Sequence, residues 1–599
     1  MTVAGVVGLT TVLAIASVWD DSVIVDEVPH IGAGYSYLVK KDMRLNPEHP
    51  PLAKDLAAIP LLFLNLNQEA FTTRFWQADV NGQWEFGRYL MFNSGPPSRE
   101  ASDGQGNDAD QIKHWAKLPM LLFFILSAAL VFAWANRLYG RAGAMIALTL
   151  FSFSPTVIAH WRFVTTDMRA LFWVLFGTYF FLKYLRQPNR KNLIVSGAFV
   201  GIALLTKFST FLILPYLGLL AAVYGFVKNA GGSFRAKIFC ALRFALYAFL
   251  IFLIGFLIVV WPVYYFHIYD YPPARQHQDT QFLLGSFGNR PLAEAVVWMS
   301  DKPVIRAPAQ YLLGLLMVVQ RSAGGNTTYF LGEVSAAGWH SYFPVVYFIK
   351  EPLAWWALAA IALGANAAQT KNEKRRIKNL AAHFDEFAML LWLAIYWATS
   401  IRSNLNIGVR HLLPIYPFAI ILVSGQLTAI SNKLISNKLR NRYIAYCLLL
   451  TALLGWFIFE SLKVYPHYLT YFNQVVGGPS GGYRYVVDSN LDWGQDLLRL
   501  SKWVKQNGIQ KIELDYFGWA DPAYYLKDRY IWLNSTKYRD AADFVSRNQS
   551  GGWLAVSATF LQGSKGTPDN PSYPNYDDWL KAHQPVTVIG NSIFVYNLK

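Results

Sequence analysis

The sequence contains little cysteine and little charge. Only 2 of its 599 residues are cysteines, and Cys240 and Cys447 both lie inside apolar runs, which favours two small buried hydrophobic side chains over a disulfide or a metal site. Charged residues make up 15% of the chain and apolar residues 54%. A soluble chain of this length would form about four domains of ~150 residues. The composition excludes that organisation, and it also excludes disorder, collagen and small disulfide scaffolds.

The sequence also lacks the short motifs of several enzyme classes. It has no Gly-rich Walker loop, no HExxH and no CxxC pattern, so nucleotide hydrolysis, zinc proteolysis and thiol redox chemistry have no support. We find no repeat of 20 to 50 residues. The chain is instead rich in aromatic residues, at 16%, and has a net charge of +16. Such an aromatic content fits membrane interfaces.

Apolar segments of about bilayer length predict a polytopic α-helical membrane protein. There are eleven of them: 4–19, 115–135, 142–160, 169–185, 193–206, 209–227, 240–262, 343–368, 386–401, 412–430 and 443–460. The first has the length of a signal peptide. It has no basic residue before it and no small-residue cleavage site before Trp19, so we expect it to remain as a span.

The basic residues lie between alternate spans and therefore indicate the orientation. They are Arg137 and Arg141; Lys183, Arg186, Arg190 and Lys191; Lys228, Arg235, Lys237 and Arg243; Lys371, Lys374, Arg375, Arg376 and Lys378; and Lys433, Lys438, Arg440 and Arg442. If the spans alternate, all these loops share one side, which the excess of Lys and Arg identifies as cytoplasmic. The positive charge is then a feature of topology, and we expect no nucleic-acid partner.

This orientation predicts two regions. Residues 1–460 form a transmembrane domain with large outer loops at 20–114 and 263–342, and residues 461–599 form a soluble extracytoplasmic α/β domain. We call residues 461–599 the tail. Within it we expect strands at 485–487, 511–517, 553–557 and 586–597, and a helix at 493–507. In the first outer loop, the apolar residues and flanking prolines of Leu52 to Phe63 favour a helix lying in the membrane interface.

Acidic residues and histidines gather at the outer ends of the spans. Asp26, Glu27 and His30 follow the first span, and Asp167 lies in the turn between the third and fourth spans, close to His160 and Arg162. Ionisable groups at this depth are costly unless they line a hydrated cavity, so we interpret them as a functional site. Two alternatives stay open: the first group simply ends a helix in water, and Asp167 only caps the fourth span.

Basic residues lie at the same outer level. Lys207 separates the fifth and sixth spans, and Arg410 and His411 follow the ninth. Arg presents a planar fork that binds phosphate through two hydrogen bonds, whereas Lys207 could merely extend its amine to the interface. A carboxylate that accepts a proton from a hydroxyl, together with cations that stabilise a leaving phosphate, could move a sugar from a lipid phosphate to a hydroxyl.

Several segments together resemble the membrane glycosyltransferases of the GT-C class. They are Asp26–His30, Asn46–Leu52, Thr165–Met168, Lys207–Ser209, Gly332–Val334 with Tyr342–Pro344, Asn406–Pro414 and Ser489–Asp496. The chain is most similar to the bacterial branch of glycosyltransferase family 39, which is related to the dolichyl-phosphate-mannose protein mannosyltransferases and to the aminoarabinose transferase of lipid A. Lys117 stands where many relatives have Arg.

The resemblance implies inverting transfer from a polyprenyl-phosphate-linked sugar, with Asp26 as the base. Glu27, His30 and Asp167 become supporting or acceptor-positioning residues, and Lys207, Arg410 and His411 become contacts to the donor phosphate. His49, His160 and Arg162 are further supporting or acceptor residues. Aromatic residues of the tail, namely Tyr516, Trp519 and Tyr524, offer surfaces to a sugar or an acceptor, or else form the core of that domain.

We therefore expect a polyprenyl-phosphate-sugar-dependent glycosyltransferase of the plasma (inner) membrane, with its active site outside and a protein, lipid or glycan acceptor. The main alternative is a transporter or a flippase of lipid-linked sugars, which would place charges near the bilayer midplane. A second is a membrane-anchored binding protein whose tail does the work. No cofactor is certain. Asp26, Glu27, His30 and Asp167 could bind a divalent cation if the fold brings them together, which their spacing does not establish.

Overall fold

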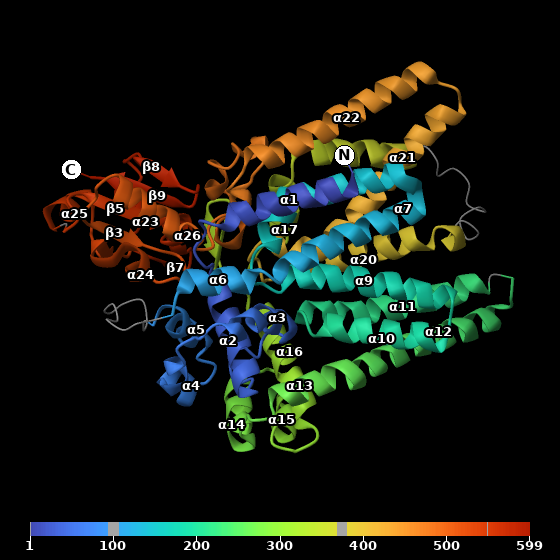
Figure 1. Cartoon of the computed structure of the whole chain (residues 1–599), viewed down its shortest axis with the longest axis horizontal. Coiled ribbons are helices and arrows are strands. Elements are labelled where there is room, and N and C mark those ends of the chain that lie inside the picture. Colours follow the sequence, from blue (N-terminus) through green and yellow to red (C-terminus); the bar gives the residue numbers. More distant parts are fainter. Residues whose placement is uncertain (1, 94–106, 230, 368–379, 548, 599) are drawn as a thin grey trace.

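Long helices form a bundle, and a small mixed β-sheet with short helices lies at one end of it (Figure 1). The computed structural model describes residues 2–93, 107–229, 231–367, 380–547 and 549–598. Within these ranges, six helices are long and apolar enough to cross a membrane, and a sharply bent pair makes a seventh. This composition is that of a multi-pass membrane protein. The predicted count of eleven spans stays a prediction.

The segment predicted as the first outer loop folds into short helices beside the first long one. Their bounds are α1 (Val3–Val18), α2 (Glu27–Lys40), α3 (Leu52–Ala58), η1 (Ile59–Phe63), η2 (Glu69–Thr72), α4 (Arg74–Gln77), α5 (Gln83–Phe92) and α6 (Ala109–Lys117). The segment expected in the interface forms α3 and η1, and it exposes Ile59, Leu62 and Phe63. These apolar side chains suit a membrane surface.

Helix α7 (Met120–Ser152) folds back on itself at Gly140. Gly140 has a φ of 74°, which glycine adopts readily. The rings of Phe124 and Phe151 would be ~40 Å apart on one straight helix, yet their centroids are 6.1 Å apart. The two halves therefore lie side by side, as the separate predicted segments 115–135 and 142–160 require.

Further long helices complete the bundle. Their bounds are α8 (Pro155–Trp161), α9 (Asp167–Arg186), α10 (Arg190–Leu204), η3 (Phe208–Leu212), α11 (Ile213–Lys228), α12 (Phe234–Gly255), η4 (Phe256–Val260), α13 (Trp261–His267), α20 (Phe384–Ile401), η6 (Val409–Ile415), α21 (Tyr416–Ser436) and α22 (Arg440–Lys463). Cys240 on α12 and Cys447 on α22 are free thiols. They are half-buried rather than buried as expected, because both helices turn many apolar side chains outward.

The predicted span 343–368 is not one straight helix. Helices α17 (Tyr342–Lys350) and α18 (Leu353–Ala367) meet at an angle of 109°. Pro352 explains the bend, because proline disfavours helical backbone at the preceding residue, and Glu351 accordingly has φ −106° and ψ 143°. Residue 368 lies outside the described residues.

The second outer loop contributes α14 (Pro273–Leu283), α15 (Arg290–Met299), α16 (Arg306–Gly324), β1 (Thr328–Phe330) and β2 (Glu333–Ser335). At the opposite end of the bundle, away from the sheet, lie the turns that connect α9 with α10 and α21 with α22 (Figure 1). These two basic turns share one end, as alternating spans require. The predicted inner loop 369–385 lies mostly outside the described residues, since 368–379 are not among them, and so do Lys371, Lys374, Arg375, Arg376 and Lys378.

The tail contains a five-stranded sheet of order β4-β3-β5-β9-β8. Strand β3 is parallel to β4 and β5, and β9 is antiparallel to β5 and β8. The strand bounds are β3 (Ile512–Asp515), β4 (Tyr530–Trp532), β5 (Trp553–Ser557), β6 (Gly566–Thr567), β7 (Asn570–Pro571), β8 (Thr587–Ile589) and β9 (Ile593–Asn597). The helices are η7 (Tyr468–Thr470), η8 (Gln474–Val476), η9 (Gly482–Arg484), η10 (Asp488–Asn490), α23 (Leu497–Gln506), α24 (Pro522–Leu526), η11 (Lys527–Arg529), α25 (Ala541–Arg547), α26 (Ala558–Gly563) and α27 (Tyr576–Trp579).

Two of the strand predictions for the tail are corrected. Residues 485–487 form no strand, because Val486 makes only an isolated bridge to Phe330. The segment 586–597 is two strands, since Gly590 and Asn591 have positive φ and reverse the chain between them. Strands near 511–517 and 553–557 are confirmed, and the helix predicted at 493–507 begins at Leu497.

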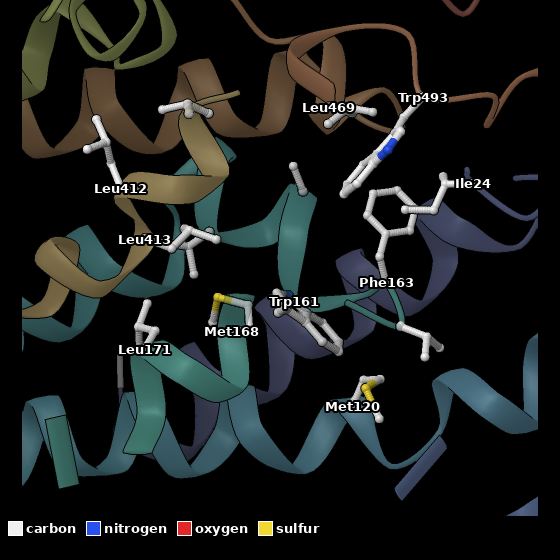
Figure 2. Packing of buried hydrophobic residues seen from close by; sticks show 14 of the residues in the cluster. Ile24, Met120, Trp161, Phe163, Met168, Leu171, Leu412, Leu413, Leu469 and Trp493 are labelled. Carbon is white, nitrogen blue, oxygen red and sulfur yellow. The ribbon is translucent and has the colours of Figure 1, made fainter. Parts of the chain in front are cut away.

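The hydrophobic core is continuous from the bundle into the tail. Figure 2 shows Trp493 of the tail beside Phe163 and Ile24, and the centroids of the Trp493 and Phe163 rings are 5.8 Å apart. Nearby, Trp161 stacks on Phe124 at 4.9 Å. The tail is therefore fastened to the end of the bundle, and the space between them is where a site can form.

Candidate functional site

A cavity of about 620 Å³ lies between the end of the bundle and the tail. Segments far apart in the sequence contribute charged side chains and histidines to its wall. These residues are Asp26, His30, Glu48, His49, Lys207, Arg321, Arg402, Arg410, His411 and Asp488. A concave, partly apolar pocket with convergent polar groups is the usual form of a small-molecule site.

Glu27 fixes the backbone that presents Asp26. Its carboxylate is fully buried and accepts hydrogen bonds from the backbone N–H groups of Ile24, at 3.0 Å, and Val164, at 2.9 Å. Lys117 forms an ion pair with it at 3.1 Å. Glu27 does not line the cavity, so Asp26 is the member of the acidic pair that faces the open space.

Arg410 is held at the wall of the cavity by two carboxylates and a ring. Its Nη1 lies 2.6 Å from Oδ2 of Asp26 and 3.7 Å from Oδ2 of Asp167. The guanidinium also lies 4.3 Å from the centroid of the Trp493 ring, in a cation–π contact. The planar group therefore has a defined orientation before any ligand binds.

Asp167 joins the two predicted phosphate contacts. Its Oδ1 lies 2.5 Å from Nζ of Lys207, and its side chain is only 1% exposed, compared with 21% for Asp26. Burial raises the pKa of Asp167, but Lys207 and Arg410 lower it by more, so the net pKa lies below its usual value. An enclosed carboxylate with a lowered pKa is poorly suited to accept a proton.

Three of the predicted histidines line the cavity in addition to these charges. Nδ1 of His30 lies 2.9 Å from the carbonyl oxygen of Val164, and the His30 ring meets the edge of the His49 ring at 5.1 Å. Burial lowers the pKa of His30 to about 4 and holds that of His49 well below its usual value. These two side chains are therefore neutral hydrogen-bonding groups at neutral pH. The third, His411, adjoins Phe343.

His160 and Arg162 are not part of this wall. The ring of His160 lies behind Trp493, with centroids 6.0 Å apart. Arg162 forms an ion pair with Asp21 at 3.1 Å and donates to Ser17 at 3.0 Å. Both residues support the segment that presents the site, and neither borders the cavity.

Sequence reasoning missed Asp488, Glu48, Arg321 and Arg402 as members of the site. Asp488 directly precedes the segment Ser489–Asp496, which the sequence does single out, and its φ of 55° is rare for a residue other than glycine. Burial raises the pKa of its carboxyl to about 6, although Arg410 and the backbone N–H of Ser489 lower it. Arg321 and Arg402 resemble ordinary basic residues at helix ends, so their sequence context carried no sign of a shared cavity.

The four residues considered for a cation do not converge. Glu27 is turned toward backbone N–H groups, and Oδ1 of Asp167 is turned toward Lys207. Over the described ranges, no group of three or more His, Cys, Asp or Glu side chains is arranged to hold a metal ion.

The fold and the site define a multi-pass membrane protein with a charged cavity between its helical bundle and an attached α/β tail. Residues 113–261 match the family model described as dolichyl-phosphate-mannose-protein mannosyltransferase. The resemblance to GT-C glycosyltransferases of the family 39 type is thereby confirmed. A comparison with curated proteins found no match.

Solved structures similar to the chain include three membrane enzymes. The oligosaccharyltransferase AglB of Archaeoglobus fulgidus is 12% identical over 95% of this chain and 71% of its own, with a TM-score of 0.45. ArnT of Cupriavidus metallidurans bound to undecaprenyl phosphate is 14% identical over 100% of this chain and 98% of its own, with a TM-score of 0.27. The S. cerevisiae protein O-mannosyltransferase Pmt1–Pmt2 complex is 20% identical over 43% of this chain and 33% of the matched chain, with a TM-score of 0.29. TM-scores below 0.5 establish no common site.

Proposed function

We propose that the protein transfers a sugar from a polyprenyl-phosphate donor to a hydroxyl group, with inversion at the anomeric carbon. The observation that carries the proposal is the convergence of a partly exposed carboxylate, Asp26, with the cations Arg410 and Lys207 on one cavity. The family match supports a donor of this class.

The proposed reaction uses one proton acceptor and no general acid. The acceptor oxygen attacks the anomeric carbon, its proton passes to the carboxylate of Asp26, and the bond between that carbon and the phosphate oxygen breaks. The phosphate leaves with the bonding electron pair, and Arg410 and Lys207 stabilise its growing charge. Attack from the face opposite the phosphate inverts the sugar.

The other site residues hold these three groups in place. Asp167 fixes both cations, and Glu27 fixes the backbone beside Asp26. The neutral ring of His30 donates through Nδ1 to the carbonyl oxygen of Val164, so its Nε2 can accept a hydrogen bond from a sugar hydroxyl. The neutral ring of His49 can donate one hydrogen bond, and neither ring adds charge. Arg321 and Arg402 add further positive charge to the cavity wall, which suits an anionic donor.

A transporter or a flippase of lipid-linked sugars is the second candidate function. Such a protein would hold its charged site at discontinuous helices near the bilayer midplane. The charges of this cavity instead lie where the bundle meets the tail, and the outer loops and the tail contribute much of the wall. This arrangement favours chemistry at the membrane surface.

The first prediction tests the transfer. Purified protein in lipid is incubated with candidate polyprenyl-phosphate sugars, and release of the free lipid phosphate is followed by mass spectrometry. Asp26→Asn keeps the shape of the side chain but removes the proton acceptor, so turnover should fall about 100-fold or more while donor binding persists.

Asp20→Asn is the matched control, because Asp20 is half-exposed and pairs with Lys502 away from the cavity. It should leave turnover unchanged. If Asp26→Asn turns over at nearly the wild-type rate, Asp26 is not the base. Movement of intact lipid-linked sugar across the bilayer without release of lipid phosphate would favour the flippase.

A further inference from the structure

A second cavity of about 540 Å³ adjoins the first on the side of the tail. It lies where the parallel strands β3 and β4 end, since Asp515 and Trp532 are their last residues and both line it. The carboxyl ends of parallel strands are where open α/β sheets bind ligands. We refer to this cavity as the tail crevice.

The lining of the tail crevice is rich in aromatic rings and mostly neutral. Its rings are those of Tyr516, Phe517, Trp519, Tyr530, Trp532 and Phe560. Between them lie hydrogen-bonding side chains, those of Asp515, Asn534, Ser535 and Ser564. The described lining includes no lysine, and its one arginine, Arg88, forms an ion pair with Asp521 at 3.0 Å. Flat rings with interspersed carboxylate, amide and hydroxyl groups match the apolar faces and the hydroxyls of a sugar.

The charge of the tail crevice differs from that of the first cavity. Four cationic side chains, those of Lys207, Arg321, Arg402 and Arg410, line the first cavity and suit a phosphate. The tail crevice lacks comparable positive charge, so it suits a neutral ligand. The two cavities are therefore complementary in what they can hold.

The two cavities are also adjacent and share part of their walls. Val25, Phe517 and Trp519 line both of them, and Val25 directly precedes Asp26. Trp84 of α5 stacks on Trp519 with ring centroids 5.0 Å apart, which forms an aromatic wall at the junction. A ligand that extends from the tail crevice past these shared residues would come close to the carboxylate that faces the first cavity.

We propose that the tail crevice binds a neutral glycan and that a hydroxyl of this glycan is the acceptor. This inference rests on the proposed transfer and names its acceptor class. The acceptor O–H loses its proton to Asp26, its oxygen forms a glycosidic bond to the anomeric carbon of the donor sugar, and the lipid phosphate leaves with the electron pair of the broken bond. The product is a glycan longer by one sugar.

Binding is tested with full-length protein in lipid nanodiscs on an array of neutral oligosaccharides that also carries peptides. Trp532 is 48% exposed, so truncating it should not disturb folding. Trp532→Ala should weaken binding of the retained oligosaccharides about tenfold through loss of the stacking surface. Trp532→Tyr, which keeps an aromatic face, should retain most of the affinity for these oligosaccharides. Trp298→Ala is the matched control, because Trp298 is exposed on α15 and lies far from the tail crevice.

Turnover provides an independent readout. With a bound oligosaccharide as acceptor and a polyprenyl-phosphate sugar as donor, Trp532→Ala should raise the KM for the acceptor about tenfold. The affinity for the donor should not change, because the residue lies outside the first cavity. Binding of peptides in place of oligosaccharides, or an acceptor KM unaffected by Trp532→Ala, would overturn the proposal. Oligosaccharide binding that depends on Trp532, without release of lipid phosphate from any donor, would instead support the crevice and contradict the transfer.

Discussion

At the scale of single residues, the two carboxylates next to Arg410 differ in what they can do. Asp26 retains an exposed edge, whereas Asp167 is enclosed and shared between two cations. Arg410 touches both and also Trp493. The chemistry of the site therefore depends on the geometry of one guanidinium, whose planar fork a lysine cannot reproduce.

The second prediction concerns that fork. Arg410→Lys keeps the charge but loses the planar group, so the affinity for a polyprenyl-phosphate sugar should fall about tenfold. Arg410→Ala should reduce it further, because Asp26 and Asp167 would then face the phosphate with less compensation. Donor binding can be measured by native mass spectrometry of the protein in lipid. Arg440→Lys, at the start of α22 and outside the cavity wall, should bind as the wild type does, and unchanged affinity in Arg410→Ala would refute the phosphate role.

The third prediction uses Asp488. Its pKa is raised to about 6 by burial, so the carboxyl is ionised at pH 7.5 and neutral near pH 5. Its charge opposes an anionic donor and partly neutralises Arg410, and donor affinity should therefore rise as the pH falls through 6, by up to about tenfold. The groups that face it are Arg410, Asp26 and Arg321.

Asp488→Asn should bind the donor with the higher affinity at both pH values. His30 does not contribute in this window, because its pKa is about 4. The donor affinities of the wild type and of Asp488→Asn, measured at pH 5 and at pH 7.5 with the same mass-spectrometric assay, test this prediction. A pH dependence that persists in Asp488→Asn would assign it to another group.

Much of the site at the residue scale could be predicted from charges at span ends. Asp26, Lys207 and Arg410 stand out because ionisable groups are rare there. The choice of Asp26 over Glu27 came from the family resemblance alone, because adjacent residues at a helix start point about 100° apart and their spacing does not show which one faces the cavity. Asp488 could not be placed either, since only the tertiary fold brings the tail to the bundle.

At the scale of elements, glycine contacts set how closely α2 approaches α5. A Cβ atom built on Gly87 would lie 2.2 Å from the carbonyl oxygen of Val28, and one built on Gly32 would lie 2.7 Å from Cα of Gly87. Val28 belongs to the first turn of α2, directly after Asp26 and Glu27. The spacing of two outer helices therefore controls where the carboxylate stands.

The fourth prediction follows from this spacing. Gly87→Ala should push the first turn of α2 away, destabilise the protein by about 1–3 kcal/mol through overpacking, and reduce turnover. Thermal unfolding in detergent and release of lipid phosphate report the two effects. Gly8→Ala on α1 has open space around the new Cβ and should preserve both. A fully active and stable Gly87→Ala protein would show that the helices can separate without moving Asp26.

Apolar runs predict where helices lie better than they predict how helices bend. The segments around α12, α20 and α22 match their predicted spans closely, since length and hydropathy define them. The bend between α17 and α18 comes from Pro352, which with Lys350 and Glu351 interrupts the apolar segment 343–368. Likewise, the pattern of 586–597 indicates extended backbone, but only the positive φ of Gly590 and Asn591 separates β8 from β9.

At the scale of the whole molecule, the basic turns lie at the end of the bundle away from the tail (Figure 1). The cavity lies at the other end, since residues of the tail line it. The excess of basic residues in those turns predicts that they are cytoplasmic, which would put the cavity and the tail outside. This sidedness determines which leaflet can supply the donor.

The fifth prediction tests the sidedness. Single cysteines replace two exposed serines, Ser436 at the end of α21 and Ser480 in the tail, in a background of Cys240→Ala and Cys447→Ala. A membrane-impermeant maleimide should label position 480 and not 436 in intact cells, and both positions after permeabilisation. The reverse pattern would place the cavity in the cytoplasm and contradict transfer from an outer-leaflet donor.

The charged contacts between the segment that follows α1 and the tail have a consequence for biosynthesis. Asp21 forms ion pairs with Arg162 and with Arg499, and Arg499 also pairs with Asp496. The ribosome makes Asp21 and Asp26 among the first residues, but Arg499, Trp493 and Asp488 only after all the long helices. A nascent chain therefore carries the carboxylate of the site for most of its synthesis without the partners that complete the cavity. Under the proposed function, a chain can therefore become active only after the tail has emerged and docked.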